Sequence, residues 1–342
     1  MDRSASEITF DEKGVCNFCR QMEKSLAEIE EEKTNLCKRI EKIKKDGEGK
    51  KYDCLIGLSG GVDSSTALRH AVSLGLRPLC WAIDNGYNDP RADENVMKLV
   101  EGMKVPFEKH NIHKGNFRAM QGAFLQSGVP NIEIPTDHIL MAKTYELANR
   151  YGIKWVISGG NVATEGIMPE SWGYNARDLR HIKDIYKGSL AGLPVCGLSK
   201  FNYYRWAKRI KIFYLLDYMG YNRLEAEKEL EKEYNYISTG AKHEENYFTK
   251  WHMNYYLFEK FGIDKRKAHL SSLINSGQMT KKEALAELSK NPEFPILGIE
   301  EQVMKIPNKS HDDYKKDEKL WRFFTISIRA LRKPYRILKK II

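Results

Sequence analysis

The sequence predicts an α/β fold organised around a doubly wound parallel sheet, and three observations support this prediction. Short apolar runs alternate with helix-compatible segments between residues 51 and 160 of the 342-residue chain. Such an alternation is typical of parallel strands joined by crossover helices. The first run turns through two glycines directly into a helix, and polar residues follow several of the runs. In a doubly wound sheet these polar loops meet at the carboxyl edge, where ligands bind.

The first strand and its loop are the most informative stretch of the chain. Residues 54–58 are a short apolar run typical of a buried parallel strand, and residues 66–75 are compatible with a helix. Between them, glycines allow close approach of the backbone and the start of the helix supplies free N–H groups, so the loop predicts an anion site. The residues assigned to this site are Ser59, Gly60, Gly61, Val62, Asp63, Ser64 and Ser65.

Asp63 narrows the kind of anion. A carboxylate beside a phosphate is repulsive unless a Mg²⁺ ion lies between them. The loop therefore predicts a pyrophosphate with its metal ion, and it differs from the GxxxxGK[ST] loop because no lysine follows the glycines. The alternative is an ordinary Gly-Ser turn between a strand and a helix.

The overall composition restricts the class of protein. With 42% hydrophobic residues the chain can bury a substantial core, and its net charge of +10 favours an anionic partner: a nucleotide, a sugar nucleotide, a nucleic acid or an acidic protein. It has neither an apolar run long enough to span a membrane nor a signal peptide, which predicts a cytoplasmic protein without a transmembrane segment. Six cysteines in such a chain favour thiols or metal ligands over a disulfide framework.

Residues 1–50 form the first of three expected parts. Cys16 and Cys19 are spaced as C-x-x-C, which suits one metal ion, but a closed structural zinc site needs four ligands. Because the chain has no second C-x-x-C, the pair is either an incomplete Zn²⁺ site or two incidental thiols. Residues 21–50 are rich in Glu and Lys, with apolar residues at helical intervals, and predict one amphipathic helix.

Residues 51–198 are expected to form the sheet domain. Further strands are predicted at 79–83, 107–112 and 153–158, and helices at 96–103, 117–126 and 136–151, with Thr136 and Asp137 as the cap of the last helix. Polar loops follow the strands that end at residues 83 and 158. The residues assigned to ligand binding there are Asp84, Asn85, Gly86, Gly159, Gly160, Asn161 and Glu165.

Residues 199–342 are expected to be helical and to contact a substrate or a partner. The segment 203–218 is rich in aromatic and basic residues, which fits either stacking on nucleic-acid bases or packing in a core. Clusters of Lys, Arg and His at 240–244 and 261–269 suit a second phosphate or carboxylate group. Thr280 and Glu283 predict the capping box of another helix. Residues 321–342 alternate basic and apolar side chains, as in a terminal helix that is free or contacts a membrane surface or a partner.

These stretches carry resemblances at two levels. The loop SGGVDSS is similar to that of N-type ATP pyrophosphatases, which cut ATP between the α and β phosphates and transfer AMP to an oxygen. A wider set of blocks resembles the N-acetyl sugar amidotransferases of bacterial surface-glycan biosynthesis, including lipopolysaccharide O-antigen, which convert an acetamido group into an acetamidino group. In chain order the blocks are YDCLIGLSGGVDSS, AIDNGYN, IPTDHI, ISGGNVATEG, SWGYNARDL, FGIDKRKAHLSSLINSGQMTKKEAL and KSHDDY.

The second resemblance implies a fold and a set of ligands. The fold is of the adenine-nucleotide α-hydrolase type, with a helical C-terminal region over the active site. The cofactors are ATP and Mg²⁺, the intermediate is an adenylated imidate, and ammonia displaces AMP from it. Asp63, with Glu165 as a helper, would hold Mg²⁺. The other residues expected to act on phosphates are Lys200, Lys242 and Arg266.

Two departures from the family pattern bear on the ligands. Family members usually carry an earlier C-x-x-C, and residues 1–7 lack it, so half of the expected zinc site is missing. Many related tRNA-modifying pyrophosphatases have paired Asp residues after the fourth strand, where this chain has Asn161, Thr164 and Glu165. The second departure favours a sugar substrate over tRNA.

The source of ammonia predicts the partners. A glutaminase needs a nucleophilic cysteine at the processed N-terminus or on a nucleophile elbow, and this chain has neither. The resemblance therefore implies a separate glutaminase and a barrel-type ammonia-channel subunit, with an acetamido sugar nucleotide as substrate and no nucleic acid. The main alternative is a tRNA thiolase or a lysidine-type tRNA ligase, and the third is a non-catalytic nucleotide-binding protein. Assembly as a homo-oligomer stays open.

Overall fold

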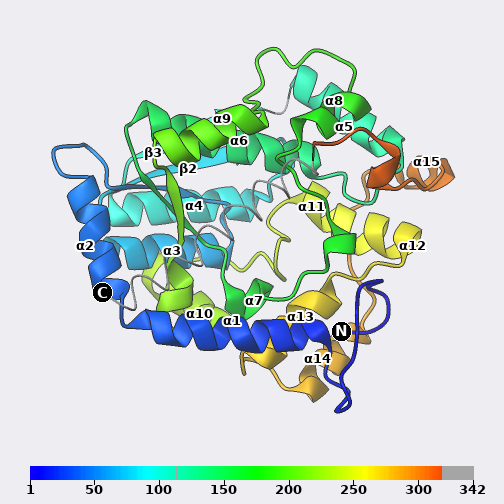
Figure 1. Cartoon of the computed structure of the whole chain (residues 1–342), viewed down its shortest axis with the longest axis horizontal. Helices are drawn as coiled ribbons and strands as arrows, with labels where there is room; N and C mark the ends of the chain where they lie inside the picture. Colours follow the sequence, from blue (N-terminus) through cyan, green and yellow to red (C-terminus); the bar gives the residue numbers. More distant parts are fainter. Residues whose placement is uncertain (113, 318–342) are drawn as a thin grey trace, which may run out of the picture.

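A five-stranded parallel sheet lies at the centre of the computed structural model, which describes residues 1–112 and 114–317 (Figure 1). The strand order is β3-β2-β1-β4-β5, and all four pairings are parallel. The order reverses at β1, which has β2 on one side and β4 on the other, and a crevice at such a reversal is where doubly wound sheets bind ligands. The strands are β1 (Cys54–Gly57), β2 (Pro78–Asp84), β3 (Phe107–Asn111), β4 (Trp155–Ser158) and β5 (Lys211–Tyr214).

Helices cover both faces of the sheet because alternate strand residues point to opposite sides. Cys54 and Ile56 of β1 belong to one buried cluster, and Leu55 between them belongs to another. Figure 1 shows α3 and α4 on one side of the sheet and α6 and α9 on the other. The first cluster includes side chains of α2 (Leu36–Asp46), α3 (Val62–Ser73), α4 (Pro90–Met103) and α10 (Arg223–Tyr234), and the second those of α6 (Ile134–Arg150) and α9 (Leu198–Asn202). The predicted doubly wound α/β fold is confirmed.

Strand β5 corrects the prediction for the C-terminal part. It lies beyond residue 198, in the stretch expected to be helical, yet it pairs with β4 and completes the sheet. Its short apolar core is Ile212 and Phe213, of which Phe213 is buried while Ile212 is exposed. Two lysines and a run of aromatic residues around it match a helical pattern equally well, which explains the error.

The start of α6 is a second correction. The helix begins at Ile134, with Glu133 as its N-cap, so Thr136 and Asp137 lie inside the first turn rather than capping it. Pro135 near the start supplies the fixed φ that suits a first helical turn. In consequence Glu133 and Asp137 lie one turn apart, with the Asp137 N–H donating to the Glu133 carbonyl at 3.0 Å.

The N-terminal segment folds as two helices instead of the single one predicted. Helix α1 (Asn17–Lys33) and α2 are separated by Thr34 and Asn35. Cys16 is the N-cap of α1, and its Sγ accepts the Cys19 N–H at 3.4 Å. The C-x-x-C pair therefore starts a helix, a role that needs no metal ion.

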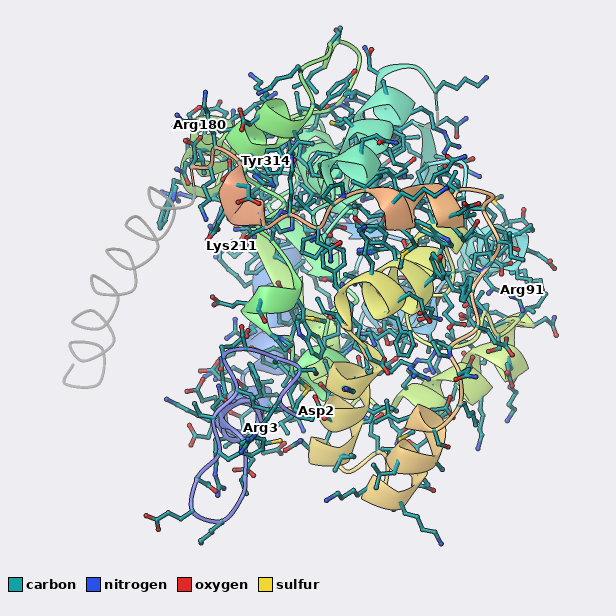
Figure 2. The ribbon with its side chains drawn as sticks, turned by 90° about the vertical axis from the view of Figure 1, so that its right-hand side faces the viewer. Asp2, Arg3, Arg91, Arg180, Lys211 and Tyr314 are labelled. Carbon is teal, nitrogen blue, oxygen red and sulfur yellow. The ribbon has the colours of Figure 1, made fainter. Side chains whose placement is uncertain are left out.

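Several of the remaining helices contribute side chains to two further buried clusters. The chain returns to α8 at residues 311–317, where His311 bonds His181 at 3.0 Å and Asp317 pairs with Arg180 at 3.3 Å. Figure 2 labels Arg180 and Tyr314 in this part of the molecule. The capping box of Thr280 and Glu283 on α14 is confirmed. The helices are α5 (Asn116–Ser127), α7 (Val162–Glu165), α8 (Leu179–Ile185), α11 (Tyr247–Trp251), α12 (Leu257–Phe261), α13 (Arg266–Asn275), α14 (Lys281–Leu288) and α15 (Glu300–Lys305), with the short helices η1 (Glu170–Trp172), η2 (Tyr203–Ala207), η3 (Leu215–Tyr218), η4 (His252–Tyr256) and η5 (His311–Asp313).

Two expectations concern membranes and the end of the chain. Across the described ranges, 1–112 and 114–317, no helix combines the length and the apolar character that crossing a membrane requires. The predicted helix at 321–342 lies outside the described residues.

Candidate active site

The loop after β1 is shaped by close packing of its glycines. Gly60 has φ +80°, and a Cβ there would lie 2.2 Å from the carbonyl oxygen of Ala92 on α4. Gly61 is the N-cap of α3 and offers no side chain to the first N–H groups of the helix. These N–H groups and the positive end of the helix therefore remain open to an anion, as predicted.

The hydroxyls of the loop divide into two kinds. The Ser59 N–H donates to Ser64 Oγ at 3.2 Å, and the two hydroxyls lie 3.3 Å apart, so Ser59 and Ser64 fix the turn while keeping surface exposed to solvent. Ser65 is buried, and its hydroxyl donates to the Gly61 carbonyl at 2.8 Å. Ser65 thus acts in the loop geometry and is a weaker candidate for a phosphate donor than Ser59 or Ser64.

The loop after β4 lies against the same helix start. A Cβ on Gly159 would meet the Ser64 backbone nitrogen at 2.7 Å, so only glycine allows this approach. Asn161 is buried and caps α7, because its Oδ1 accepts the Thr164 N–H at 2.9 Å. Gly159 and Asn161 therefore place α7, and with it Glu165, beside the first turn of α3.

The charged centre of the site is Lys242, whose ammonium group contacts two carboxylates and a hydroxyl. It contacts the Asp63 carboxylate, lies 3.0 Å from Glu165 Oε1 and donates to Thr164 Oγ1 at 2.7 Å. The Lys242 side chain is only 8% exposed, so this contact is held inside the protein. The structure thus brings together Asp63, Glu165 and Lys242, three residues that the sequence analysis assigned to the site.

The sequence analysis did not assign two residues of this centre to the site. The Tyr221 hydroxyl donates to Asp63, and burial, with the Asp63 charge beside it, raises the pKa of the phenol, which stays neutral. His243 Nε2 lies 3.6 Å from Glu165 Oε1. Tyr221 gave no signal because it lies in no motif, whereas His243 follows Lys242 directly and belonged to a basic cluster already noted.

The donor set fits a Mg²⁺ ion only together with a ligand. Asp63 and Glu165 supply two carboxylates on one cation, which is the usual protein share of a Mg²⁺ site completed by phosphate oxygens and water. Within the described part of the chain, no group of three or more His, Cys, Asp or Glu side chains is placed to hold a metal ion by itself. The residues therefore suit Mg²⁺ that arrives with a nucleotide.

The comparisons with known proteins show a family match in the C-terminal region. Residues 245–327 match the family described as LPS biosynthesis protein WbpG-like, C-terminal domain. The chain therefore contains a WbpG-like C-terminal domain. An uncharacterised protein of Methanocaldococcus jannaschii is 27% identical over 156 residues, which cover 44% of this chain and 53% of that protein. The chain thus spans about half the length of this relative.

Three solved structures are similar to parts of this chain. The NH3-dependent NAD synthetase of Campylobacter jejuni is 15% identical, with 78% of this chain and 99% of that chain covered and a TM-score of 0.33. The U34-tRNA thiolase NcsA of Methanococcus maripaludis is 13% identical, with 80% and 88% covered and a TM-score of 0.36. The NMN synthetase of Francisella tularensis is 17% identical, with 56% and 71% covered and a TM-score of 0.31.

The start of the WbpG-like domain lies on the two loops predicted to bind ATP. A Cβ on Gly61 would lie 3.1 Å from Glu245 Oε1, and Asn246 Nδ2 donates to Asn85 Oδ1 at 2.8 Å. Asp84, before Asn85, accepts the Gly86 N–H at 2.8 Å and lies 3.4 Å from Lys109. The loop after β2 is thus held in place by its own turn and by the WbpG-like domain.

Two predicted phosphate-binding residues lie elsewhere. Lys200 is exposed on α9, with its Nζ 5.9 Å from the ring of Tyr204, and Figure 1 shows α9 beside α6, away from α7. Arg266 of the WbpG-like domain pairs with Asp264 at 2.8 Å and donates to the Lys290 carbonyl. Lys200 is therefore separate from the Asp63 centre, and Arg266 fixes the local fold at the start of α13.

The aromatic segment 203–218 divides between the two predicted roles. Tyr204 and Phe213 are buried in the core, as expected from packing. Tyr203, Trp206 and Tyr214 are about half exposed, at 49%, 48% and 48%. Core packing thus explains only part of the segment.

The C-x-x-C pair is close together, and among the described residues no further ligand completes a metal site with it. Cys16 Sγ and Cys19 Sγ lie 3.3 Å apart, and Asn275 Nδ2 of the WbpG-like domain lies 3.4 Å from Cys19 Sγ. Burial raises the pKa of the Cys19 thiol, which disfavours the thiolate that zinc requires. All six cysteines are free. The structure gives no support for the Zn²⁺ site.

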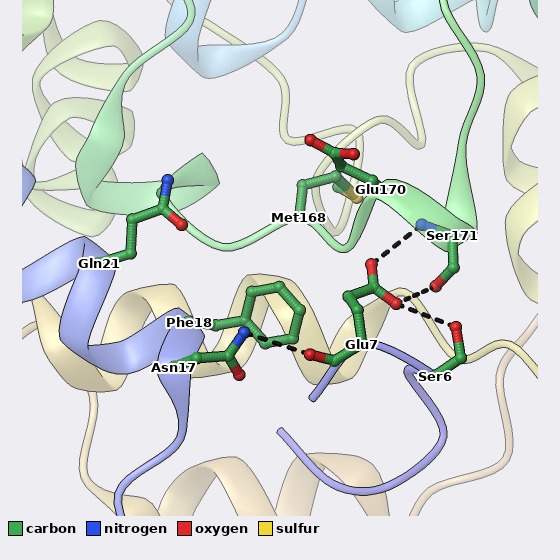
Figure 3. A pocket seen from close by; sticks show the side chains of 9 residues that line it. Ser6, Glu7, Asn17, Phe18, Gln21, Met168, Glu170 and Ser171 are labelled. Atoms are coloured by element: carbon green, nitrogen blue, oxygen red, sulfur yellow. Dashed lines mark hydrogen bonds between the residues drawn. The ribbon is translucent and has the colours of Figure 1, made fainter. Parts of the chain in front are cut away.

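A cavity of about 500 Å³ lies between the N-terminal segment and η1 (Figure 3). Glu7 forms part of its wall and accepts bonds from the Ser171 N–H at 3.0 Å and the Ser171 hydroxyl at 2.5 Å. Gly166, which follows Glu165, also lines the cavity, but none of the residues predicted to bind ATP does. The cavity adjoins the candidate active site without including it.

Proposed function

We propose that the chain is an ATP-dependent synthetase that converts the acetamido group of a sugar, carried by a nucleotide, into an acetamidino group for lipopolysaccharide biosynthesis. The reaction would form AMP and pyrophosphate through an adenylated imidate that ammonia attacks. The observation that carries the proposal is the position of the WbpG-like domain. Its first residues, Glu245 and Asn246, lie on the two loops whose sequence resembles that of ATP pyrophosphatases.

The amide substrate determines what the site must do. An amide oxygen is a poor leaving group, so it has to be converted into a better one before nitrogen can replace it. In the proposed first step, the amide oxygen attacks the α phosphorus of ATP and the bond to pyrophosphate breaks. The open N–H groups at the start of α3 and the Lys242 ammonium group would stabilise the charge that grows on the departing pyrophosphate.

The carboxylates have a separate part in this proposal. Asp63 and Glu165 would hold Mg²⁺, which when bound neutralises phosphate charge. Tyr221 donates to Asp63 and so fixes the orientation of its carboxylate. The Thr164 hydroxyl accepts a hydrogen bond from the Lys242 ammonium group, which holds this group between Asp63 and Glu165.

Ammonia would come from partner subunits. The chain has no recognisable glutaminase nucleophile, and burial raises the pKa of the Cys54, Cys80 and Cys196 thiols, which makes them poor nucleophiles. We therefore propose a separate glutaminase and a barrel-type channel subunit as partners, as the resemblance implies.

The test is turnover of ATP across a panel of acetamido sugar nucleotides with ammonium chloride. We expect pyrophosphate release only with the correct sugar, and a product lighter by about 1 Da, because NH replaces an oxygen atom. The isolated chain should use ammonium and not glutamine, and addition of the glutaminase and the channel subunit should restore the use of glutamine. Glutamate release from glutamine by the isolated chain would contradict the partner assignment, and pyrophosphate release without any sugar dependence would contradict the function.

A tRNA-modifying pyrophosphatase is the second candidate, and the surface of residues 203–214 favours it. Tyr203, Trp206 and Tyr214 are about half exposed there, and the Lys208 Nζ lies 5.5 Å from the Tyr203 ring. Exposed aromatic and basic side chains together suit stacking on bases. Pyrophosphate release that is stimulated by tRNA, with binding that weakens steeply as salt rises, would support this candidate. Failure of tRNA to stimulate release would remove it.

A further inference from the structure

A second group of polar side chains lies at the starts of α6 and α13. Glu133 and Asp137 are one turn apart on α6, and Lys265 and His269 are one turn apart at α13, where the His269 N–H donates to the Lys265 carbonyl at 3.3 Å. The charges of Asp137 and Glu133 both act on Lys265. Neither ATP binding nor the adenylation step described above uses these residues.

Several polar atoms of this group are buried without a partner. Among the residues that the structure describes, Glu133 Oε1, Thr136 Oγ1 and His269 Nε2 have no hydrogen-bond partner. The Glu133 side chain is 8% exposed, and its other oxygen accepts the Thr249 hydroxyl at 2.6 Å. Leaving buried polar atoms unpaired costs stability, so a cluster of them indicates a place where a polar ligand binds.

Asp137 is exposed to solvent in the first turn of α6. Its side chain is accessible to solvent, yet burial is the main cause that raises its pKa, to about 6. A small polar molecule can therefore reach Asp137.

The group is continuous with the candidate active site. The rings of His269 and His243 lie 5.5 Å apart, and His243 Nε2 lies 3.6 Å from Glu165 Oε1. Lys265 and His269 lie within the WbpG-like domain, so the same domain borders both places. A molecule held at Asp137 would therefore lie on the same side of the protein as the adenylated substrate.

We propose that Glu133 and Asp137 form the site where ammonium is bound and converted into ammonia for the second half of the reaction. The proposal deepens the proposed function and rests on it. The substrate of this site is the ammonium ion, and its product is the NH₃ molecule that attacks the imidate carbon.

The step needs two protons to be removed. One carboxylate takes a proton from NH₄⁺, which leaves NH₃ with a free lone pair. A C–N bond then forms at the imidate carbon, the C–O bond to AMP breaks, and AMP leaves with that electron pair. The nitrogen that has been added loses its extra proton to the second carboxylate. Because the imidate nitrogen has kept the proton of the original amide, the product is an amidinium. Two carboxylates one turn apart suit two proton transfers at one place.

The charges that surround the two carboxylates suit a cation. Burial, and then the charge of Asp137, raises the pKa of Glu133 to about 7. Burial lowers the pKa of Lys265, and it lowers the pKa of His252 to about 3 and that of His269 well below its usual value. The two histidines are therefore neutral and do not repel ammonium. When both carboxylates are ionised, two negative charges face the one positive charge of Lys265, which leaves one negative charge for NH₄⁺.

The test measures the two halves of the reaction separately in two variants, Glu133→Gln and Asp137→Asn. ATP–pyrophosphate exchange that depends on the sugar reports adenylation, and amidine formation at varied ammonium reports the second half. We expect exchange within about twofold of wild type and kcat/KM for ammonium about 100-fold lower near pH 7.5, the range of general-base catalysis. Wild-type kcat/KM for ammonium should fall as pH drops through 7 to 6, and the variants should lose that profile. Glu146→Gln, on the exposed part of the same helix, is the matched control.

Two outcomes would overturn the assignment in distinguishable ways. Equal losses in exchange and in amidine formation would show that the carboxylates support adenylation or the fold and do not act on ammonium. If wild type shows no exchange with any sugar, the proposed function fails, and the site is then tested by binding alone. In that case ammonium chloride should raise Tm above an equal concentration of sodium chloride in wild type and Glu146→Gln but not in the two variants. An equal Tm in both salts for wild type would remove the ammonium site.

Discussion

The ammonium group of Lys242 contacts the carboxylate of Asp63, although 179 positions separate the two residues in the chain. Asp63 belongs to the first turn of α3 and Lys242 to the segment just before the WbpG-like domain. The same ammonium group lies 3.0 Å from Glu165. Three distant segments thus meet at one cation, which makes the centre sensitive to the loss of any one charge.

The first prediction concerns Asp63→Asn. The change removes the negative charge expected to hold Mg²⁺ and keeps the shape of the side chain, so the fold should persist. We expect ATP–pyrophosphate exchange to fall by about 100-fold or more, as for the loss of one preorganised electrostatic contact. Asp11→Asn is the control, because Asp11 also pairs with a cation, Arg20, but on the surface. Exchange at the wild-type rate in Asp63→Asn would remove this residue from the mechanism.

The second prediction compares two glycines. In Gly60→Ala the new Cβ would meet the Ala92 carbonyl at 2.2 Å, and φ +80° is unfavourable for alanine. We expect the free energy of unfolding to fall by about 1–3 kcal/mol, with loss of nucleotide binding. Gly122→Ala lies in the interior of α5 with open space around it, and should raise stability by about 0.5–1 kcal/mol. Urea unfolding of both variants checks the contrast, and equal effects would contradict the packing argument.

The third prediction follows the pKa of Glu133, which burial raises from 4.5 to about 7. An acid whose pKa is higher in the folded state binds its proton more tightly there, so ionisation destabilises the fold as pH rises from about 5 to about 8. Glu133→Gln lacks this effect. The stability of the variant relative to wild type should therefore increase over that range, by roughly 3 kcal/mol. Unfolding free energies at several pH values give the measurement.

Glu146→Gln again serves as the control for this titration. Burial acts to raise the pKa of Glu146, but the hydrogen bond from Lys143 and the neighbouring positive charges lower it overall. Its contribution to stability thus has the opposite sign and is present above its usual pKa. A pH dependence of the same direction in both variants would show that Glu133 does not titrate as described.

The fourth prediction concerns zinc. The described residues offer Cys16 and Cys19 with no group of three metal ligands, so purified protein should hold less than about 0.5 Zn²⁺ per chain. Cys16→Ser should keep the stability of wild type, since serine caps a helix at least as well. Elemental analysis after dialysis against a chelator is the measurement. Stoichiometric zinc that survives the chelator would contradict the prediction.

The sequence was sufficient for four of the five strands, because these four have strong local patterns. The apolar runs before Ser59 and Gly159 end in glycines, and the helices between them have regular apolar spacing. Strand β5 was missed because its residues have no such boundary and because pairing with β4 decides its conformation. The break between α1 and α2 was missed as well, since Thr34 and Asn35 interrupt the helix without a glycine or proline.

The candidate site was predictable where a motif marks it and unpredictable where only the tertiary fold does. Asp63 and the glycines around it lie in one motif, so their placement at the start of α3 followed directly from the sequence. Lys242 was a reasonable choice from a basic cluster, whereas Lys200 from the same reasoning lies on α9. The roles of Tyr221 and Glu133 could not be predicted from the sequence. The contact of Tyr221 with Asp63 and the burial of Glu133 against α11 both depend on packing between distant segments.

The two edge strands of the sheet affect how the protein behaves at high concentration. Among the residues that the structure describes, β3 and β5 each pair with one neighbouring strand, and such edges can pair with strands of other molecules and start aggregation. Both strands are short, with five residues in β3 and four in β5, and both carry a lysine. These lysines are Lys109 on β3 and Lys211 on β5, and Figure 2 labels Lys211. Charged side chains on short edge strands oppose such pairing. Replacing Lys211 by a β-branched apolar residue should therefore make the protein precipitate at lower concentration while its fold is unchanged.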